Sequence, residues 1–209
     1  MARIGVDTSN HNGQVFVAFD GRLRGIITIS DKIKDEAAST IKDLRHLGVK
    51  RTYILSGDRE EGVRRVAEAV GVDEFYYALT PEEKYSKLEE VFTSAKSTMY
   101  VGDGINDSPS LARADIGVAM GSIGQDSAIE AADVVVMTDN LEKLPLAVKI
   151  ARKTLRISWQ NIVFALGVKG LILILGLFGV ANMWLAVFAD VGVAVLAILN
   201  SMRALRAPK

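Results

Sequence analysis

Two long apolar runs near the end of the chain restrict its possible folds more than any other feature of the 209 residues. Residues 157–178 contain a single charged residue, Lys169, and residues 184–202 contain a single charged residue, Asp190. At roughly 1.5 Å per residue, a helix of either length spans about 30 Å, which is the hydrocarbon thickness of a bilayer. We therefore expect a two-helix transmembrane hairpin with a short turn at residues 179–182.

Basic residues flank both ends of this expected hairpin. By the positive-inside rule, both ends then lie in the cytoplasm, and so does the highly charged segment that precedes them. We expect an integral protein of the plasma (inner) membrane with a cytoplasmic soluble domain. The flanking basic residues are Arg152, Lys153, Arg156, Arg203, Arg206 and Lys209.

The charged segment alternates expected strands with expected helices, which is typical of a parallel α/β sheet. It opens differently, because residues 14–19 and 23–29 are apolar runs joined by Asp20-Gly21, a dipeptide that favours a tight hairpin turn. The sequence thus predicts a β-hairpin, then a doubly wound parallel sheet. Expected helices are residues 36–46, 60–70, 81–92 and 108–114, and expected strands are residues 52–55, 98–101, 116–120 and 134–137.

Composition excludes several kinds of site. The chain has no cysteine, so it can build neither a disulfide nor a thiolate metal site by itself. Its formal net charge is zero, and we expect no nucleic acid among its partners. The first residues show no basic stretch followed by a long apolar run, so they do not resemble a signal peptide.

The turn after the expected strand 98–101 offers ligands for a divalent cation. Residues 102–107 read Gly-Asp-Gly-Ile-Asn-Asp, which presents Asp103, Asn106 and Asp107 beside flexible glycines. Ligands of α/β sheets bind where strands end, and this set suits Mg²⁺ next to a phosphoryl group. An isolated Asp-Gly is more often an ordinary turn.

Two further elements point to the same chemistry. Ser56-Gly57-Asp58 follows the expected strand 52–55, and its hydroxyl and amides can hold phosphate oxygens. Lys84, at the start of the helix that Pro81 opens, can add a positive charge against a phosphoryl transition state. Each has an ordinary alternative, because Ser-Gly-Asp can be a simple turn and Lys84 a solvated helix residue. Their joint occurrence favours a phosphoryl-transfer site.

These motifs resemble those of the haloacid dehalogenase superfamily, and specifically of the P-type ATPases. The likeness continues through Pro-x-x-Lys at residues 81–84 and Ile-Gly-Val-Ala-Met-Gly at residues 116–121. It implies a haloacid-dehalogenase-like fold, ATP as the phosphoryl donor, and Mg²⁺ held by Asp103 and Asp107. The resemblance also implies catalytic roles for Ser56, Gly57, Asp58, Lys84, Asn106 and Asp107.

One departure from that family stands out. Its pumps form an aspartyl phosphate on an Asp-Lys-Thr-Gly-Thr motif, which is absent from the sequence. Asp7-Thr8 is superficially similar but lacks the Lys and the Gly-Thr, so we expect the isolated chain to be inactive and its sheet to lack one strand. The resemblance divides the chain into residues 1–30, a hairpin leading from a missing nucleotide-binding domain; residues 31–150, an incomplete phosphorylation domain; and residues 151–209, the membrane hairpin.

Lys169 and Asp190 are the two charges within the expected spans. Ionisable residues cost a few kcal/mol in a bilayer, so they are expected to face protein and each other. They lie at similar depth, because 169 − 156 and 203 − 190 both equal 13 residues from the flanking arginines. Residue chemistry alone leaves two readings open: a structural ion pair, or a carboxylate ligand for a divalent cation with a built-in counter-charge.

The resemblance favours the second reading. Asn161 followed by Lys169, together with Asp190-Val191-Gly192, is similar to the signature of the last two membrane helices in the zinc, cadmium and lead pumps. We therefore expect Asp190 and Lys169 to form the site of transported Zn²⁺ or Cd²⁺, with lead as a further candidate.

Our leading hypothesis is that the chain is the carboxy-terminal portion of an ATP-driven zinc or cadmium efflux pump. Its expected partners are the transported metal, the lipid bilayer, and the remainder of the pump: the actuator domain, the nucleotide-binding domain and the earlier membrane helices. A membrane-anchored phosphatase is an alternative, but it needs an Asp-x-Asp nucleophile near the amino terminus, which the sequence lacks. A non-enzymatic regulator that binds a full-length pump also stays open.

Overall fold

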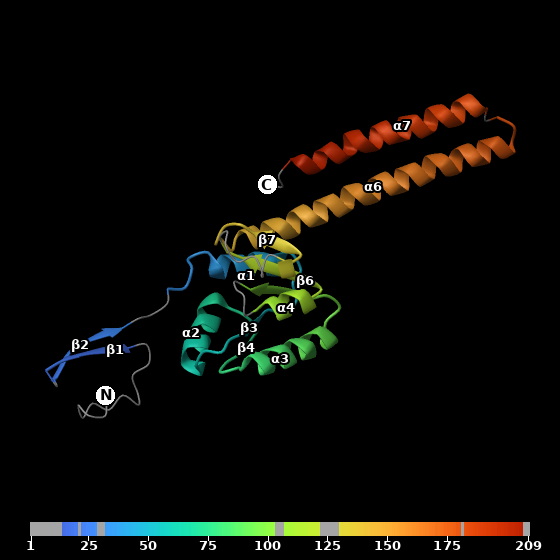
Figure 1. Ribbon diagram of the computed structural model, residues 1–209. Coiled ribbons are helices and arrows are strands. Elements are labelled where there is room, and N and C mark those ends of the chain that lie inside the picture. Colours follow the sequence, from blue (N-terminus) through green and yellow to red (C-terminus); the bar gives the residue numbers. More distant parts are fainter. Residues whose placement is uncertain are drawn as a thin grey trace. The chain divides into compact units, whose positions relative to one another are not determined.

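The computed structural model describes residues 14–20, 22–28, 32–102, 107–121, 130–180 and 182–206. It divides the chain into two units, Met1–Asp35 and Glu36–Lys209. In the first unit, β1 (Gln14–Phe19) and β2 (Arg22–Thr28) form an antiparallel hairpin, and Asp20 adopts a φ of 52° at its turn, as the Asp-Gly dipeptide predicts (Figure 1). A lone two-stranded hairpin is marginally stable in water. Phe19 is 73 % exposed, so this hairpin leaves apolar surface open to solvent.

The second unit contains the alternating helices and strands that the sequence predicts, and every strand pair in it is parallel. The predicted α/β class is therefore confirmed. The short strand β4 was not predicted. In chain order the elements are α1 (Ala37–His46), β3 (Tyr53–Leu55), α2 (Glu60–Val70), β4 (Glu74–Tyr76), α3 (Pro81–Ser94), β5 (Met99–Gly102), α4 (Ser108–Arg113), β6 (Ile116–Met120) and β7 (Val134–Val136).

The parallel strands form two sheets rather than one continuous sheet. One sheet has the order β3-β4 and the other the order β5-β6-β7. Within the described residues, β3 pairs with β4 alone and β5 pairs with β6 alone. Both β3 and β5, like the terminal strands β4 and β7, therefore have one edge without a strand partner in this part of the chain.

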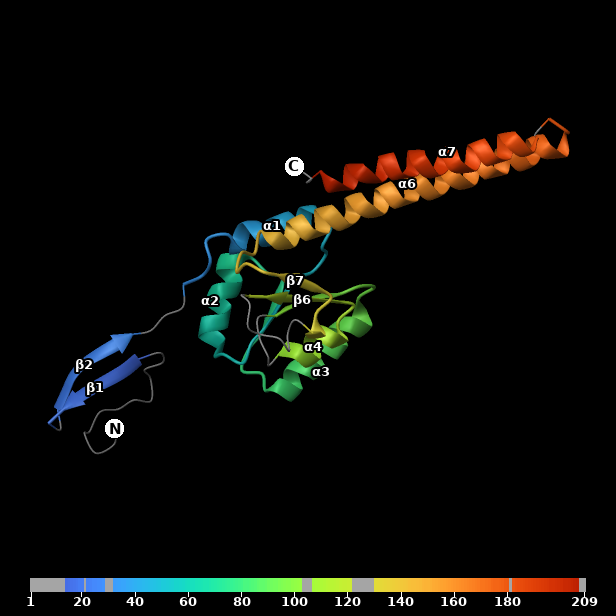
Figure 2. The same cartoon turned by 45° about the horizontal axis from the view of Figure 1, so that its top comes forward.

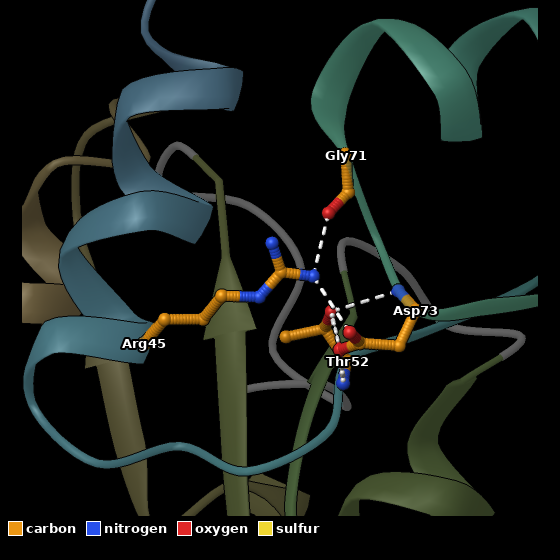
Figure 3. Close-up of polar contacts among 4 residues, drawn as sticks. All are labelled: Arg45, Thr52, Gly71 and Asp73. Atoms are coloured by element: carbon orange, nitrogen blue, oxygen red, sulfur yellow. Dashed lines mark hydrogen bonds and ion pairs between the residues drawn. The ribbon is translucent and has the colours of Figure 1, made fainter.

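An aspartate holds the start of β3 against the start of β4 (Figure 3). The Thr52 amide and hydroxyl donate to Asp73 Oδ2 at 2.8 and 2.7 Å. Arg45, from α1, donates to Asp73 Oδ1 at 2.8 Å and to the Gly71 carbonyl at 2.7 Å. The Thr52 hydroxyl, and then the Thr52 amide and the Arg45 guanidinium, hold the pKa of Asp73 below its ordinary value.

Aspartate carboxylates also join the starts of neighbouring strands in the second sheet. The amide and the hydroxyl of Thr98 donate to Asp115 Oδ2 at 2.7 and 2.9 Å, immediately before β5 and β6 begin. The Gly117 amide donates to Asp133 Oδ2 at 2.8 Å, next to the start of β7. Each parallel strand pair is thus joined at its amino end by a carboxylate.

Helix α4 packs directly on β6. Leu111 of α4 is fully buried and lies with Ala119 in one core cluster. The close approach requires a glycine, because a Cβ at Gly117 would lie only 2.4 Å from the carbonyl oxygen of Leu111. On the other side of the sheet, Leu144 packs with Val118 and the neighbouring buried side chains of β6 and β7.

Two long helices complete the second unit: α6 (Lys143–Leu177) and α7 (Met183–Ser201), followed by the short 3₁₀ helix η3 (Met202–Leu205). Both long helices are long and apolar enough to cross a bilayer, and hardly any of their most apolar residues are buried by the rest of the described chain. They lie side by side in both views (Figures 1 and 2). α6 begins at Lys143, before the apolar run that was expected to span the bilayer from residue 157. Its first turns pack on the sheet through Leu144 and continue into the hairpin without a break.

Candidate functional site

The Ser56-Gly57-Asp58 loop directly follows β3 and folds back on itself. Ser56 Oγ donates to Asp58 Oδ2 at 2.9 Å and accepts from the Asp58 amide at 3.1 Å. A Cβ at Gly57 would lie 3.2 Å from the Leu79 carbonyl, so a larger residue needs its neighbour to shift. The loop therefore holds a hydroxyl and a glycine amide at the carboxyl end of a parallel strand, where a phosphate group can be bound.

The segment after β4 supports this loop from outside. The Ala78 amide donates to the Asp58 carbonyl at 2.7 Å, and the Leu79 amide donates to the Ser56 carbonyl at 3.1 Å. Ala78 has a φ of 52°, a left-handed conformation that costs a non-glycine residue about 1 kcal/mol or more. These backbone bonds hold the strained residue in place and set the shape of the loop. The sequence offered no sign of this support.

Lys84 and Asp107 form an ion pair between α3 and the residue that precedes α4. Lys84 Nζ lies 3.0 Å from Asp107 Oδ1, and the side chains are 25 % and 14 % exposed, so the pair is largely shielded from water. The Tyr100 hydroxyl also donates to Asp107 Oδ1, at 2.8 Å. Both charged residues were predicted from the sequence, but Tyr100 was not, and it could have been found only from its position two residues before Gly102 in the strand.

Local structure explains how Lys84 reaches this position. Thr80 is the N-cap of α3 and accepts from the Glu83 amide at 3.2 Å, while Glu83 Oε2 accepts from the Thr80 amide at 2.9 Å. Pro81 occupies the first helical turn, where its missing N–H costs nothing. This capping box fixes the start of the helix, and Lys84 then projects from its first turn toward Asp107.

The structure describes only some of the other residues predicted for the site in the soluble domain. Asp103 and Asn106 lie outside the described residues. Within the part that the structure describes, no hydrogen bond or ion pair joins the Ser56-Gly57-Asp58 loop to Lys84 or Asp107. The described residues of the predicted site therefore form two separate groups, one after β3 and one after β5, and each of these strands has one edge without a strand partner in this part of the chain.

The described residues do not by themselves form a metal site. No group of three or more His, Cys, Asp or Glu side chains in the described ranges could hold an ion. One oxygen of Asp107 is already engaged by Lys84 and Tyr100. Mg²⁺ bound by Asp103 and Asp107 therefore stays a prediction.

The two charges of the apolar helices meet as predicted. Lys169 Nζ of α6 lies 3.1 Å from Asp190 Oδ1 of α7. Both side chains are more than half exposed on the isolated hairpin, so they are accessible to a further ligand or to another helix. Asn161 does not join this pair and instead bonds to α7 nearer the other end of the hairpin.

Known proteins match nearly the whole chain. A family model described as haloacid dehalogenase-like hydrolase matches residues 3–115. A cadmium, zinc and cobalt-transporting ATPase of Bacillus subtilis is 50 % identical over 204 residues, which are 96 % of this chain and 29 % of the relative. A zinc-transporting ATPase of Synechocystis is also 50 % identical, over 96 % of this chain and 28 % of its own length.

A solved structure shows the same arrangement of elements. The crystal structure of a zinc-transporting PIB-type ATPase matches with a TM-score of 0.79 and 39 % identity. The match covers 93 % of this chain and 32 % of that protein. The chain therefore spans less than a third of the length of these relatives.

Proposed function

Because the chain belongs to the haloacid dehalogenase-like hydrolase family, we propose that it provides part of the phosphorylation domain and two membrane helices of an ATP-driven zinc or cadmium efflux pump. One observation carries the proposal: a lysine and an aspartate pair at 3.1 Å between two apolar helices that continue from a domain of this family. The names of the similar ATPases support zinc and cadmium as cargo. Lead is a further candidate.

In the soluble domain, the proposed chemistry is phosphoryl transfer from ATP. Ser56 and the Gly57 amide would hold phosphate oxygens, and Lys84 would offset negative charge in the transition state. Tyr100 and Lys84 keep Asp107 in one orientation at the end of β5. Mg²⁺, when bound by Asp103 and Asp107, would neutralise phosphate charge.

The nucleophile would come from the remainder of the pump. A parallel strand inserted between β3 and β5 would occupy the edges that are unpaired within the described residues. Its carboxyl end would then lie between the Ser56 loop and Asp107. An aspartate there could accept the phosphoryl group, and the nucleotide-binding domain that delivers ATP would cover the exposed apolar surface of the β1-β2 hairpin.

In the membrane, the proposed roles of the two charges differ. The Asp190 carboxylate would be a ligand for the transported divalent cation, and the Lys169 ammonium would take the place of the metal after its release. Because the chain contains no cysteine, any thiolate ligands would come from helices of the remainder. The basic residues at the helix ends favour a cytoplasmic location for both ends of the hairpin.

The test compares the isolated chain with a chimera. In the chimera, this chain replaces the matched region of the Bacillus subtilis ATPase, which is 50 % identical to it. We expect zinc-stimulated ATP hydrolysis by the chimera and none by the isolated chain, which has no Asp-Lys-Thr-Gly-Thr motif. Asp103→Asn in the chimera should abolish phosphorylation by ATP, because it removes an anionic Mg²⁺ ligand.

Two results would contradict the proposal. One is turnover by the purified isolated chain together with an acid-stable phosphoprotein. The other is a chimera that reaches the membrane in normal amount and is phosphorylated normally after Asp103→Asn at low Mg²⁺.

A further inference from the structure

A cluster of polar side chains joins α6 to α7 away from the Lys169–Asp190 pair. Asn161 Nδ2 donates to Ser201 Oγ at 2.9 Å and to the Ala197 carbonyl at 3.2 Å, and Asn161 Oδ1 accepts from Asn200 Nδ2 at 2.8 Å. We call Asn161, Asn200 and Ser201 the carboxamide cluster. Gln160 and Arg203 extend it, since Arg203 donates to Asn200 Oδ1 at 2.7 Å.

The apolar contact between these two helices does not define their register. Ala189, Val193 and Ala197, at four-residue spacing on α7, lie on its buried or half-buried side. Sliding α7 by one helical turn would therefore place one small apolar residue where another had been. On the α7 side this packing is similar before and after the slip, so the apolar contact specifies the register only weakly.

The carboxamide cluster and the ion pair define the same register. From Asn161 to Lys169 is eight residues along α6, and from Asn200 back to Asp190 is ten residues along α7. Antiparallel helices advance equally in opposite directions, so the two contacts agree to within two residues, or roughly 3 Å along the axis. A slip of one turn, about 5.4 Å, would break the cluster and separate Asp190 from Lys169.

We propose that Asn161 and Asn200 are positioning residues that set the register of α7 against α6 and thereby keep Asp190 opposite Lys169. Hydrogen bonds between side chains are directional and short, so a slip of one turn leaves their donors and acceptors without partners. The lost hydrogen bonds therefore oppose the slip, which the apolar contact opposes only weakly. The metal-binding role of the pair rests on the proposed function, but the register itself does not.

Disulfide crosslinking can measure this register because the natural chain has no cysteine. Ala165 lies four residues after Asn161, and Val193 lies four residues before Ala197, so Ala165→Cys with Val193→Cys reports the observed register. Ala165→Cys with Ala189→Cys reports a slip of one turn. Both pairs are introduced into the full chain in membranes and oxidised under identical conditions.

The decisive variant is Asn161→Leu, which removes three hydrogen bonds to α7. A hydrogen bond between membrane helices shifts such an equilibrium by roughly threefold on average. We therefore expect the ratio of slipped to in-register crosslinks to rise roughly tenfold or more. Ser158→Leu is the matched control, because Ser158 is an exposed residue of the same helix, and it should leave the ratio unchanged.

A merely structural role would give a different result. If Asn161 only stabilised the hairpin, both crosslinks would fall together and their ratio would stay constant, which would overturn the proposal. Should Asn161→Leu fail to insert, Asn200→Leu serves instead, since it removes the shared bond and should also raise the ratio. An unchanged ratio in that variant would equally overturn the proposal. The assay involves neither ATP nor metal, so its outcome is independent of whether the chain belongs to a pump.

Discussion

Gly117→Ala should destabilise the soluble domain although it adds only one methyl group. The new Cβ would lie 2.4 Å from the carbonyl oxygen of Leu111 and 2.9 Å from its carbonyl carbon. Both atoms belong to the backbone of α4, so no side chain can rotate to relieve the clash. Restoring ordinary contact requires α4 to move by about 1 Å, and overpacking of this kind costs about 1–3 kcal/mol.

The matched control is Gly62→Ala in α2, where no atom lies within 4 Å of the added Cβ. There the methyl group meets open space and replaces glycine inside a helix, so the variant should be more stable by up to about 1 kcal/mol. The two variants have the same change in composition and opposite expected signs. Opposite signs would therefore show that the loss at Gly117 comes from the clash with α4 and not from replacing a glycine as such.

Pulse proteolysis in urea, performed on the full chain in lipid nanodiscs, measures both variants. Cleavage of the soluble domain reports its unfolding, and the urea midpoint should fall for Gly117→Ala and rise for Gly62→Ala. A urea midpoint for Gly117→Ala equal to or above that of the natural chain would contradict this prediction. It would mean that α4 does not pack on β6 as closely as the structure indicates.

Two other predictions use the same assay. The Thr52 hydroxyl lowers the pKa of Asp73. The stability that this carboxylate contributes is therefore complete above its ordinary pKa of about 4, and it is lost as the pH falls through the lowered pKa. Asp73→Asn should thus flatten the loss of stability as the pH falls below about 4, whereas an equally steep acid limb would contradict this assignment. Thr80→Ala removes the N-cap of α3 and should cost about 1 kcal/mol. Thr93→Ala, near the other end of α3, serves as its control, and equal losses in both would argue against the capping box.

Regular periodicity explains why most elements of the fold were predictable. The hairpin, the main helices and the two apolar spans follow from patterns of period 2 or 3.6 and from turn residues such as Asp20 and Pro81. The strand β4 was missed because its three residues, Glu74–Tyr76, are all half-buried and show no alternation. The part of α6 before residue 157 was not predicted as a continuation of the membrane helix, because only the apolar part of that helix was recognised.

The candidate site was likewise only partly predictable from the sequence. Lys84, Asp107, Lys169 and Asp190 were found from residue type and spacing, and the structure brings them together as two ion pairs. Tyr100 and the strained Ala78 act through geometry that arises only when distant segments meet. Likewise, the aspartates that join the strand starts depend on pairing between strands, so their partners cannot be read from local sequence.

Zinc binding and phosphorylation by inorganic phosphate, measured in the chimera with Asp190→Ala or Lys169→Ala, distinguish a metal site from a structural ion pair. Removing Asp190 deletes a ligand and leaves Lys169 unpaired in an apolar environment, a loss that can reach about 3 kcal/mol or more.

We expect Asp190→Ala to lose stoichiometric zinc binding and zinc-stimulated turnover while it keeps phosphorylation by inorganic phosphate, because the soluble site is unchanged. Lys169→Ala should still bind zinc but release it more slowly. If Asp190→Ala binds and transports zinc normally, then the pair is only a structural link between two helices and the account is wrong.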